Sequence, residues 1–258
     1  MAGAAGASNP ACAARLGRSA GKQRRDAGRG PPSSHTRPAV NRIDPTLTPN
    51  RLLRLAELDA VVLHLRRGGL VVLPTETGYL LGAAALDPDA VRRAFAVKVR
   101  SPRNPMHAAV TGVEMAEQLA HLGDAARRLL QIFTPGPLTV VCPKREAVPD
   151  ILVAGTGNVG IRIPDSPVTL QIIAALGGPI TATSLNVSGD PPRASVDETI
   201  AALEWKAEAL LFVVKDPLCV LHLRPSTLVS VVDGRRLILR EGPVSAEAID
   251  AALAPGPA

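Results

Sequence analysis

From about residue 47 onward, the apolar positions of the chain repeat with spacings typical of helices and of short buried strands. Leu52, Leu55, Leu58 and Val62 recur every three or four residues, which predicts a helix ending before Gly68. The same reading predicts further helices over 87–97, 114–119, 124–132, 167–176, 195–205 and 245–253, and strands over 70–73, 106–110, 138–142, 161–163, 180–183, 210–214, 227–232 and 237–239. Strands and helices alternate without a strict βαβ repeat. This pattern predicts a single α/β domain with a twisted mixed β-sheet flanked by helices.

Residues 1–45 differ from the rest of the chain in composition. They are rich in Ala, Gly, Arg, Ser and Pro and nearly lack large apolar residues, which predicts a disordered basic tail before a folded domain over 46–258. An Arg-rich, acid-poor start is also typical of an organellar transit peptide, but the apolar residues of an amphipathic helix are sparse here. The tail holds eight basic and two acidic residues, which accounts for the whole net charge of +6. The folded part is therefore electrically balanced, unlike a domain that binds duplex nucleic acid.

The positions of the cysteines and the lengths of the apolar runs exclude further classes of protein. The three cysteines are far apart, which argues against a disulfide framework or a structural metal site and is typical of a reducing compartment. No apolar run approaches the 18 to 20 residues of a membrane span. We therefore expect a cytoplasmic protein without a membrane segment and without a bound metal of its own.

Two short polar signatures, about eighty residues apart, suggest the chemistry. Lys98 and Arg100 follow a predicted helix, and Ser184 and Asn186 follow a predicted strand. Paired cations recognise oxyanions, while hydroxyl and amide groups supply neutral donors and acceptors. Brought together, the two pairs would form a pocket for a phosphorylated ligand. Cations at a helix C-terminus also interact favourably with its exposed carbonyl groups, so the first pair alone does not establish a site.

Five sequence blocks, taken in order and spacing, resemble those of the threonylcarbamoyl-AMP synthase family, the YrdC-like proteins. The blocks are Pro74-Thr75-Glu76-Thr77-Gly78-Tyr79, Lys98-Val99-Arg100, Pro135-Gly136-Pro137-Leu138-Thr139, Arg162-Ile163-Pro164-Asp165 and Thr183-Ser184-Leu185-Asn186-Val187-Ser188-Gly189. The resemblance covers roughly residues 50–245, and it implies a YrdC-like fold.

The resemblance also implies roles for individual residues. Lys98 and Arg100 would be catalytic, since they would neutralise the polyphosphate and the charge that develops at the α-phosphorus. Both close a helix, so we expect their truncation to cost little stability. The ATP-binding residues would be Thr183, Ser184, Asn186, Arg162, Ser226 and Arg240, and the threonine-binding residues Thr75, Thr77, Tyr79 and His107.

The chain departs from the family pattern mainly at the amino-acid end of the site. Gly78 precedes Tyr79 where the family has a bulky apolar residue, and Ala109 stands in place of a histidine near the amino acid. His107 lies two residues earlier and should face the same side of its strand, because side chains alternate along a strand. We therefore expect His107 to replace the missing histidine.

The function implied by the resemblance is a nucleotidyltransferase reaction. L-threonine, bicarbonate and ATP, the last with Mg²⁺, would give L-threonylcarbamoyl-adenylate and pyrophosphate. The product would pass to the proteins that complete N6-threonylcarbamoyladenosine in tRNA, and this chain would contact tRNA weakly or indirectly. Two alternatives stay open: a carbamoyl-adenylate-forming enzyme with another acceptor, and a non-catalytic RNA-binding module of the same fold. The balanced charge of the folded part argues against the second.

Overall fold

The computed structural model describes residues 42–43, 48–98, 100–101, 103–185, 195–202, 211–216, 219 and 222–254. The predicted tail therefore lies outside the described residues, except for its last part. There, Arg42–Ile43 form strand β1, which runs parallel to β8, with Arg42 level with Val213. The regular structure thus begins before residue 46, where the sequence analysis placed the start of the domain.

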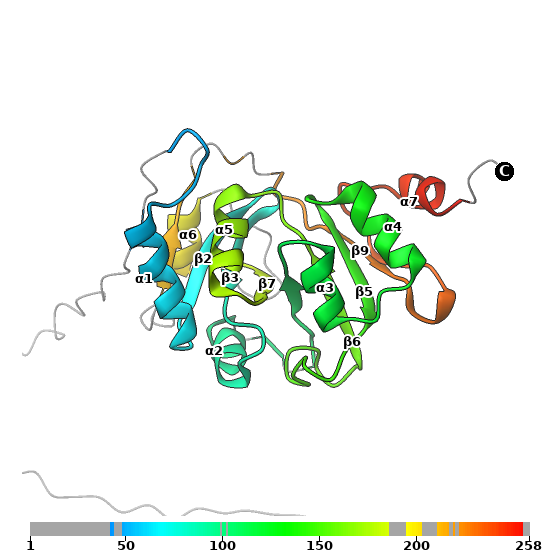
Figure 1. Cartoon of the computed structure of the whole chain (residues 1–258), viewed down its shortest axis with the longest axis horizontal. Coiled ribbons are helices and arrows are strands. Elements are labelled where there is room, and N and C mark those ends of the chain that lie inside the picture. The colour runs from blue at the N-terminus through cyan, green and yellow to red at the C-terminus, as the bar shows by residue number, and fades with distance from the viewer. Residues whose placement is uncertain are drawn as a thin grey trace, which may run out of the picture. The chain divides into compact units, whose positions relative to one another are not determined.

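A mixed ten-stranded sheet forms the centre of the described part of the chain, as the sequence predicted (Figure 1). Its strand order is β1-β8-β2-β3-β7-β4-β6-β5-β9-β10, with four parallel and five antiparallel neighbours. The remaining strands are β2 (Leu70–Thr75), β3 (Gly78–Gly82), β4 (His107–Ala109), β5 (Leu138–Pro143), β6 (Asn158–Arg162), β7 (Ile180–Ser184), β8 (Leu211–Val214), β9 (Thr227–Ser230) and β10 (Leu237–Arg240).

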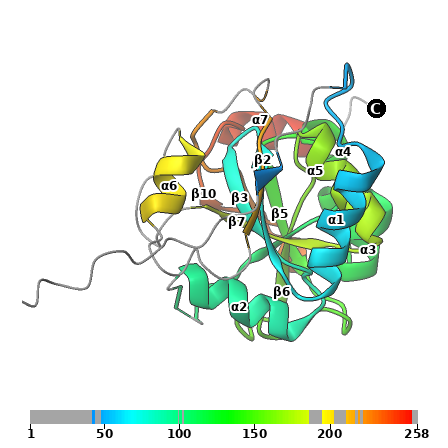
Figure 2. The ribbon, with the colours of Figure 1, turned by 90° about the vertical axis from the view of Figure 1, so that its left-hand side faces the viewer.

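Helices cover both faces of this sheet. They are α1 (Leu55–Arg66), α2 (Pro88–Lys98), α3 (Val113–Leu119), α4 (Asp124–Phe133), α5 (Pro167–Leu176), α6 (Val196–Ala202) and α7 (Ala246–Leu253), with a 3-10 turn η2 over Val232–Gly234. Apolar residues of α1 and α5 form one core cluster, and those of α2, α3, α4, α6 and α7 form another. In Figure 2, β2 and β3 accordingly lie between α1 and α6. Within the described residues, no helix is long and apolar enough to cross a membrane.

The alternation of side chains along β5 and β6 explains why a site forms on one face of the sheet. Leu138 and Val140 of β5, and Ile161 of β6, are buried in the larger core cluster. The residues between or beside them, Thr139 and Arg162, therefore point to the opposite face. These two polar side chains are level with each other on adjacent strands, and both line a cavity.

The hairpin of β2 and β3 was not predicted, because the sequence analysis ended the first strand at Pro74 and treated the following residues as a turn. In the structure, Thr75 and Gly78 are paired and Glu76–Thr77 form a two-residue turn. Gly78 has φ +123°, a conformation that residues with a side chain rarely adopt. The turn thus accounts for Gly78, where the family has a larger residue.

Candidate functional site

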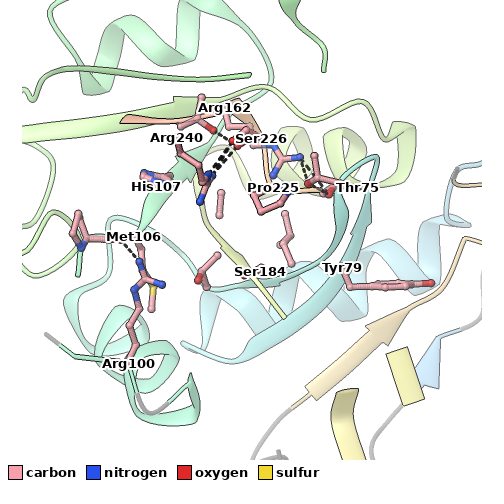
Figure 3. A pocket seen from close by; sticks show the side chains of 16 residues that line it. Thr75, Tyr79, Arg100, Met106, His107, Arg162, Ser184, Pro225, Ser226 and Arg240 are labelled. Carbon is pink, nitrogen blue, oxygen red and sulfur yellow. Dashed lines mark hydrogen bonds between the residues drawn. The ribbon is translucent and has the colours of Figure 1, made fainter. Parts of the chain in front are cut away.

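One cavity lies where the ends of several strands meet, and segments distant in the sequence supply its lining (Figure 3). Residues at the carboxyl ends of β2 and β7 contribute, as do β3, β4, β5, β6 and β10 and the segments before β4 and β9. The lining residues are Thr75, Thr77, Tyr79, Leu80, Arg100, Pro105, Met106, His107, Thr139, Arg162, Ala182, Thr183, Ser184, Pro225, Ser226 and Arg240.

Each of the five sequence blocks contributes at least one residue to this cavity. Of the predicted site residues, ten line it, Lys98 does not, and Asn186 lies outside the described residues. Thr139 also lines the cavity and was not among the predicted site residues, although it ends the third sequence block. Met106 and Ala182 line the cavity too, and their side chains carry no distinctive chemistry from which a sequence could identify them.

Arg162 is held at the centre of a buried polar network. Its Nη2 donates to Glu76 Oε1 at 2.8 Å, to Thr77 Oγ1 at 2.5 Å and to Thr75 Oγ1 at 3.4 Å. Glu76 Oε2 accepts a hydrogen bond from the backbone N–H of Asp165 at 2.9 Å. The carboxylate therefore neutralises the arginine and ties the β2–β3 turn to the segment after β6.

Arg240 is held at another side of the cavity by neutral oxygen atoms. Its Nε and Nη2 donate to the carbonyl oxygen of Ser226 at 3.1 and 3.0 Å. The Ser226 hydroxyl lies 2.8 Å from the hydroxyl of Thr139, and both residues are buried. Figure 3 shows the Arg240 guanidinium group reaching back toward Ser226 from β10. The hydroxyl groups of Thr139 and Ser226 and the guanidinium group of Arg240 therefore lie together at this side of the cavity.

Arg100 is anchored in a similar way by backbone carbonyl groups. Its Nε donates to the Asn104 carbonyl at 3.0 Å, and its Nη2 donates to the Pro105 carbonyl at 2.7 Å. Among the described residues, no carboxylate lies within 4.0 Å of the guanidinium groups of Arg100 and Arg240. Burial lowers the pKa of both groups, and the charges of Arg162 and Arg100 lower that of Arg240 further, although an arginine stays protonated in proteins. The cavity therefore contains two cations that no described carboxylate neutralises, which suits an anionic ligand.

Lys98 does not line the cavity itself but contacts Ser184, which does. Its side chain is 1% exposed, and its Nζ donates to the carbonyl oxygen of Ser184 at the end of β7. Val91, Ala94 and Phe95 are buried on the same face of α2, at helical spacing from Lys98. The expectation that truncation of Lys98 would cost little stability is therefore wrong, because it would leave a cavity and remove a donor from a carbonyl group. In this structure Lys98 positions the strand end that carries Ser184.

The buried amine of Lys98 predicts a specific dependence of stability on pH. Burial, and then the charge of Arg100, lower its pKa from 10.5 to about 7. Between these two values the unfolded chain binds a proton that the native chain does not, so the free energy of unfolding should rise with pH by up to about 1.4 kcal/mol per unit. Lys98→Met fills a similar volume without an amine. In denaturant titrations from pH 7 to 10, the wild type should therefore gain stability relative to this variant, and parallel curves would contradict the prediction.

His107 faces the cavity, whereas Ala109 does not. Ala109 is fully buried in the core cluster that α1 and α5 form with the sheet, and it is level with Arg162 on β6. Burial, followed by the charges of Arg240, Arg100 and Arg162, lowers the pKa of His107 to about 3. His107 is therefore neutral near pH 7 and is the histidine that lines the cavity, as expected from its spacing to position 109. Tyr79 lines the cavity with its ring directed away from the three arginines (Figure 3).

The part of the chain that the structure describes contains no group of side chains that could hold a metal ion at the cavity. The lining residues include no carboxylate, and among the described residues no three His, Cys, Asp or Glu side chains lie close enough to hold an ion. Glu76 is nearby but is already bonded to Arg162.

Comparisons with known proteins identify the family of this chain. The model of the Sua5/YciO/YrdC family, described under telomere recombination, matches residues 64–242. The chain belongs to this family. It is 35% identical over 187 residues to the threonylcarbamoyl-AMP synthase of Pyrococcus abyssi, a match that covers 72% of this chain and 54% of the relative. It is 30% identical over 202 residues to a putative threonylcarbamoyl-AMP synthase of Methanocaldococcus jannaschii, covering 75% and 93% of the two chains.

A solved structure of the family matches the fold described above. The structure of P. abyssi Sua5 complexed with L-threonine aligns with a TM-score of 0.73 and 30% identity, over 83% of this chain and 61% of that one. The predicted YrdC-like fold is thereby confirmed. This chain spans about half the length of the P. abyssi relative and most of the M. jannaschii one.

Proposed function

We propose that this protein forms L-threonylcarbamoyl-adenylate and pyrophosphate from L-threonine, bicarbonate and ATP. The observation that carries the proposal is that all five family blocks contribute to one cavity, which holds two arginines without a described carboxylate partner. Membership of the family and the activity named for its relatives support it. The product would serve the N6-threonylcarbamoyladenosine modification of tRNA.

The charges within the cavity suggest how the substrates are oriented. A triphosphate carries several negative charges, so it should bind where the cations lack a carboxylate partner, between Arg100 and Arg240 and beside Thr183 and Ser184. Arg162, which the sequence analysis assigned to ATP, is instead neutralised by Glu76. We therefore assign Arg162 to the amino-acid end.

The same network suggests where L-threonine binds. Thr75 and Thr77 place their hydroxyl groups beside Arg162, within 3.4 Å of its Nη2, and all three residues line the cavity. A zwitterionic amino acid has no large net charge and offers both donors and acceptors, which suits a site whose arginine is already neutralised. His107 lies on β4, the strand beside β6, and the charges of Arg240, Arg100 and Arg162 all act on it, so we place it between the two ends of the cavity.

The chemistry needs no protein nucleophile. The threonine amine and bicarbonate form a carbamate with loss of water, which creates a C–N bond. A carbamate oxygen then attacks the α-phosphorus of ATP, a new P–O bond forms, and pyrophosphate leaves with the electron pair of the broken bond. The chain would contribute by positioning the carbamate and by stabilising charge on the phosphates through Arg100 and Arg240. Mg²⁺ would accompany ATP as part of the substrate and shield its phosphates.

A labelling experiment tests this function. The purified full chain is incubated with MgATP, ¹³C-bicarbonate and threonine, serine, glycine or no amino acid, and the adenylates are identified by mass. We expect one ¹³C-labelled threonylcarbamoyl-adenylate per pyrophosphate released, with threonine preferred. Equal release of pyrophosphate without an amino acid would contradict the proposal and favour a carbamoyl-adenylate-forming enzyme with another acceptor.

A further inference from the structure

Gly160 on β6 lies directly against the ring of His107 on the neighbouring strand β4. The parallel pairing of these strands sets Ala108 level with Ile161, which brings His107 level with Gly160. A Cβ atom added at Gly160 would lie 2.9 Å from Cγ and 3.1 Å from Cε1 of His107, and closer still to its Nδ1. These three ring atoms are the nearest to the added carbon. Any residue other than glycine would therefore displace the ring.

This packing determines which ring nitrogen carries the proton. Nδ1 of His107 is buried and has no hydrogen-bond partner among the described residues. A neutral imidazole has one N–H group. Burying this N–H without an acceptor costs free energy, whereas an N–H that faces a ligand or water keeps a hydrogen-bond partner. The proton therefore belongs on Nε2, so that this N–H is the group His107 offers to the cavity it lines.

We propose that Gly160 is a positioning residue, which seats the His107 ring so that its Nε2–H donates to an oxygen atom of the bound amino acid. The inference rests on the proposed function for the identity of that ligand. The charges of Arg240, Arg100 and Arg162 all act on His107, so the ring lies between the two ends of the cavity, and a change in the KM for ATP instead of the KM for threonine would assign its N–H to the triphosphate. Gly160 leaves the space that the His107 ring occupies.

The test is a double-mutant cycle with a matched control. Gly160→Ala and His107→Ala should each raise the KM for threonine about tenfold, because each variant loses one hydrogen bond to the amino acid. The KM for ATP should change less than twofold. Gly160→Ala should add no further change in the His107→Ala background, since no ring remains to be displaced. His107→Gln keeps an N–H at similar reach and should restore part of the affinity. Gly178→Ala is the control, because an added Cβ there meets nothing within 4 Å.

Nuclear magnetic resonance adds a readout that does not depend on turnover. Imidazole ¹H–¹⁵N correlation spectra of the wild type should show His107, identified by its loss in His107→Ala, as the neutral Nε2–H form at pH 7. In Gly160→Ala its chemical shifts should change, and in Gly178→Ala they should not. Unchanged shifts, or the Nδ1–H form in the wild type, would overturn the positioning role.

The remaining outcomes also distinguish the inference from the proposed function. If Gly160→Ala does not fold, His107→Ala/Gly160→Ala should fold, because the clash is removed, and failure of the double variant would overturn the inference. A wild-type KM for threonine in folded Gly160→Ala, or additive effects in the cycle, would overturn it as well. If the wild type forms no threonine adduct at all, the proposed function fails, while the spectra still decide whether Gly160 positions His107.

Discussion

Replacing Glu76 by glutamine should lower the free energy of unfolding by about 3–5 kcal/mol, because removal of one partner leaves the charge of Arg162 buried without compensation. Glu76 and Arg162 are both less than 10% exposed, and the carboxylate also accepts the Asp165 N–H. The same change should reduce adenylate formation about a hundredfold, since the arginine would lose the contact that fixes it beside Thr75 and Thr77.

Denaturant unfolding and turnover of the same protein samples test this prediction. Glu146→Gln makes the identical chemical change at an exposed position and should leave both quantities near wild type. Glu76→Gln/Arg162→Gln should regain part of the lost stability, because no buried charge remains unpaired, but it should not regain activity. A loss below about 0.5 kcal/mol in Glu76→Gln, within the range of ordinary surface changes, would show that the pair does not organise the site.

The sheet was largely predictable from the sequence because its strands are short, apolar and bounded by turn residues. Strand β1 and the β2–β3 hairpin were not predicted, and the hairpin has a physical cause. Pro74 lacks an N–H and normally ends a central strand. In the structure, β8 pairs with β2 only at Leu70 to Val72, so no neighbour on that side needs the missing N–H of Pro74, and the strand continues to Thr75. The length of the neighbouring strand cannot be inferred from the local sequence.

The candidate site was predictable as a set of residues but not as an arrangement. Arg100, Arg162, Ser184 and Thr75 lie in motif blocks whose convergence the family resemblance implied, and the structure brings them to one cavity. The inward direction of Lys98 had a signal in the sequence, since it lies three, four and seven residues after the buried Phe95, Ala94 and Val91 of α2. Its acceptor, the Ser184 carbonyl, is 86 residues away, and only the folded chain identifies it.

The pairing of Glu76 with Arg162 likewise depends on contacts between distant segments. In the sequence, Arg162 is a mid-strand arginine that suits any anion, whether a phosphate or a carboxylate of the protein itself. The structure places Glu76 Oε1 at 2.8 Å from its Nη2, so Arg162 already has a carboxylate partner within the protein. Whether an arginine in a site can bind an anionic ligand thus depends on whether a carboxylate of the protein already pairs with it. A sequence motif does not contain this information.

Replacing Arg100 by alanine should abolish most adenylate formation, with a loss in turnover of about 10²–10³-fold. A charged donor aimed at a phosphate whose charge develops in the transition state contributes an effect of this size. Arg100 is partly exposed and is bonded to two backbone carbonyl groups of its own loop, so its truncation should leave the thermal stability of the protein nearly unchanged. The effect should therefore appear in kcat more than in folding.

Three variants measured side by side decide whether the charge of Arg100 acts at the reacting phosphate. Arg103→Ala removes an exposed arginine three residues later, outside the cavity lining, and should retain near-normal turnover. Arg100→Lys keeps the charge but loses the planar fork that bonds both carbonyl groups, so it should recover only part of the activity. If Arg100→Ala and Arg103→Ala lost activity equally, the effect would be one of general electrostatic attraction, and raising the salt concentration should then reduce wild-type turnover to the same extent. A selective loss in Arg100→Ala that salt does not reproduce would instead place this guanidinium group in direct contact with the phosphates.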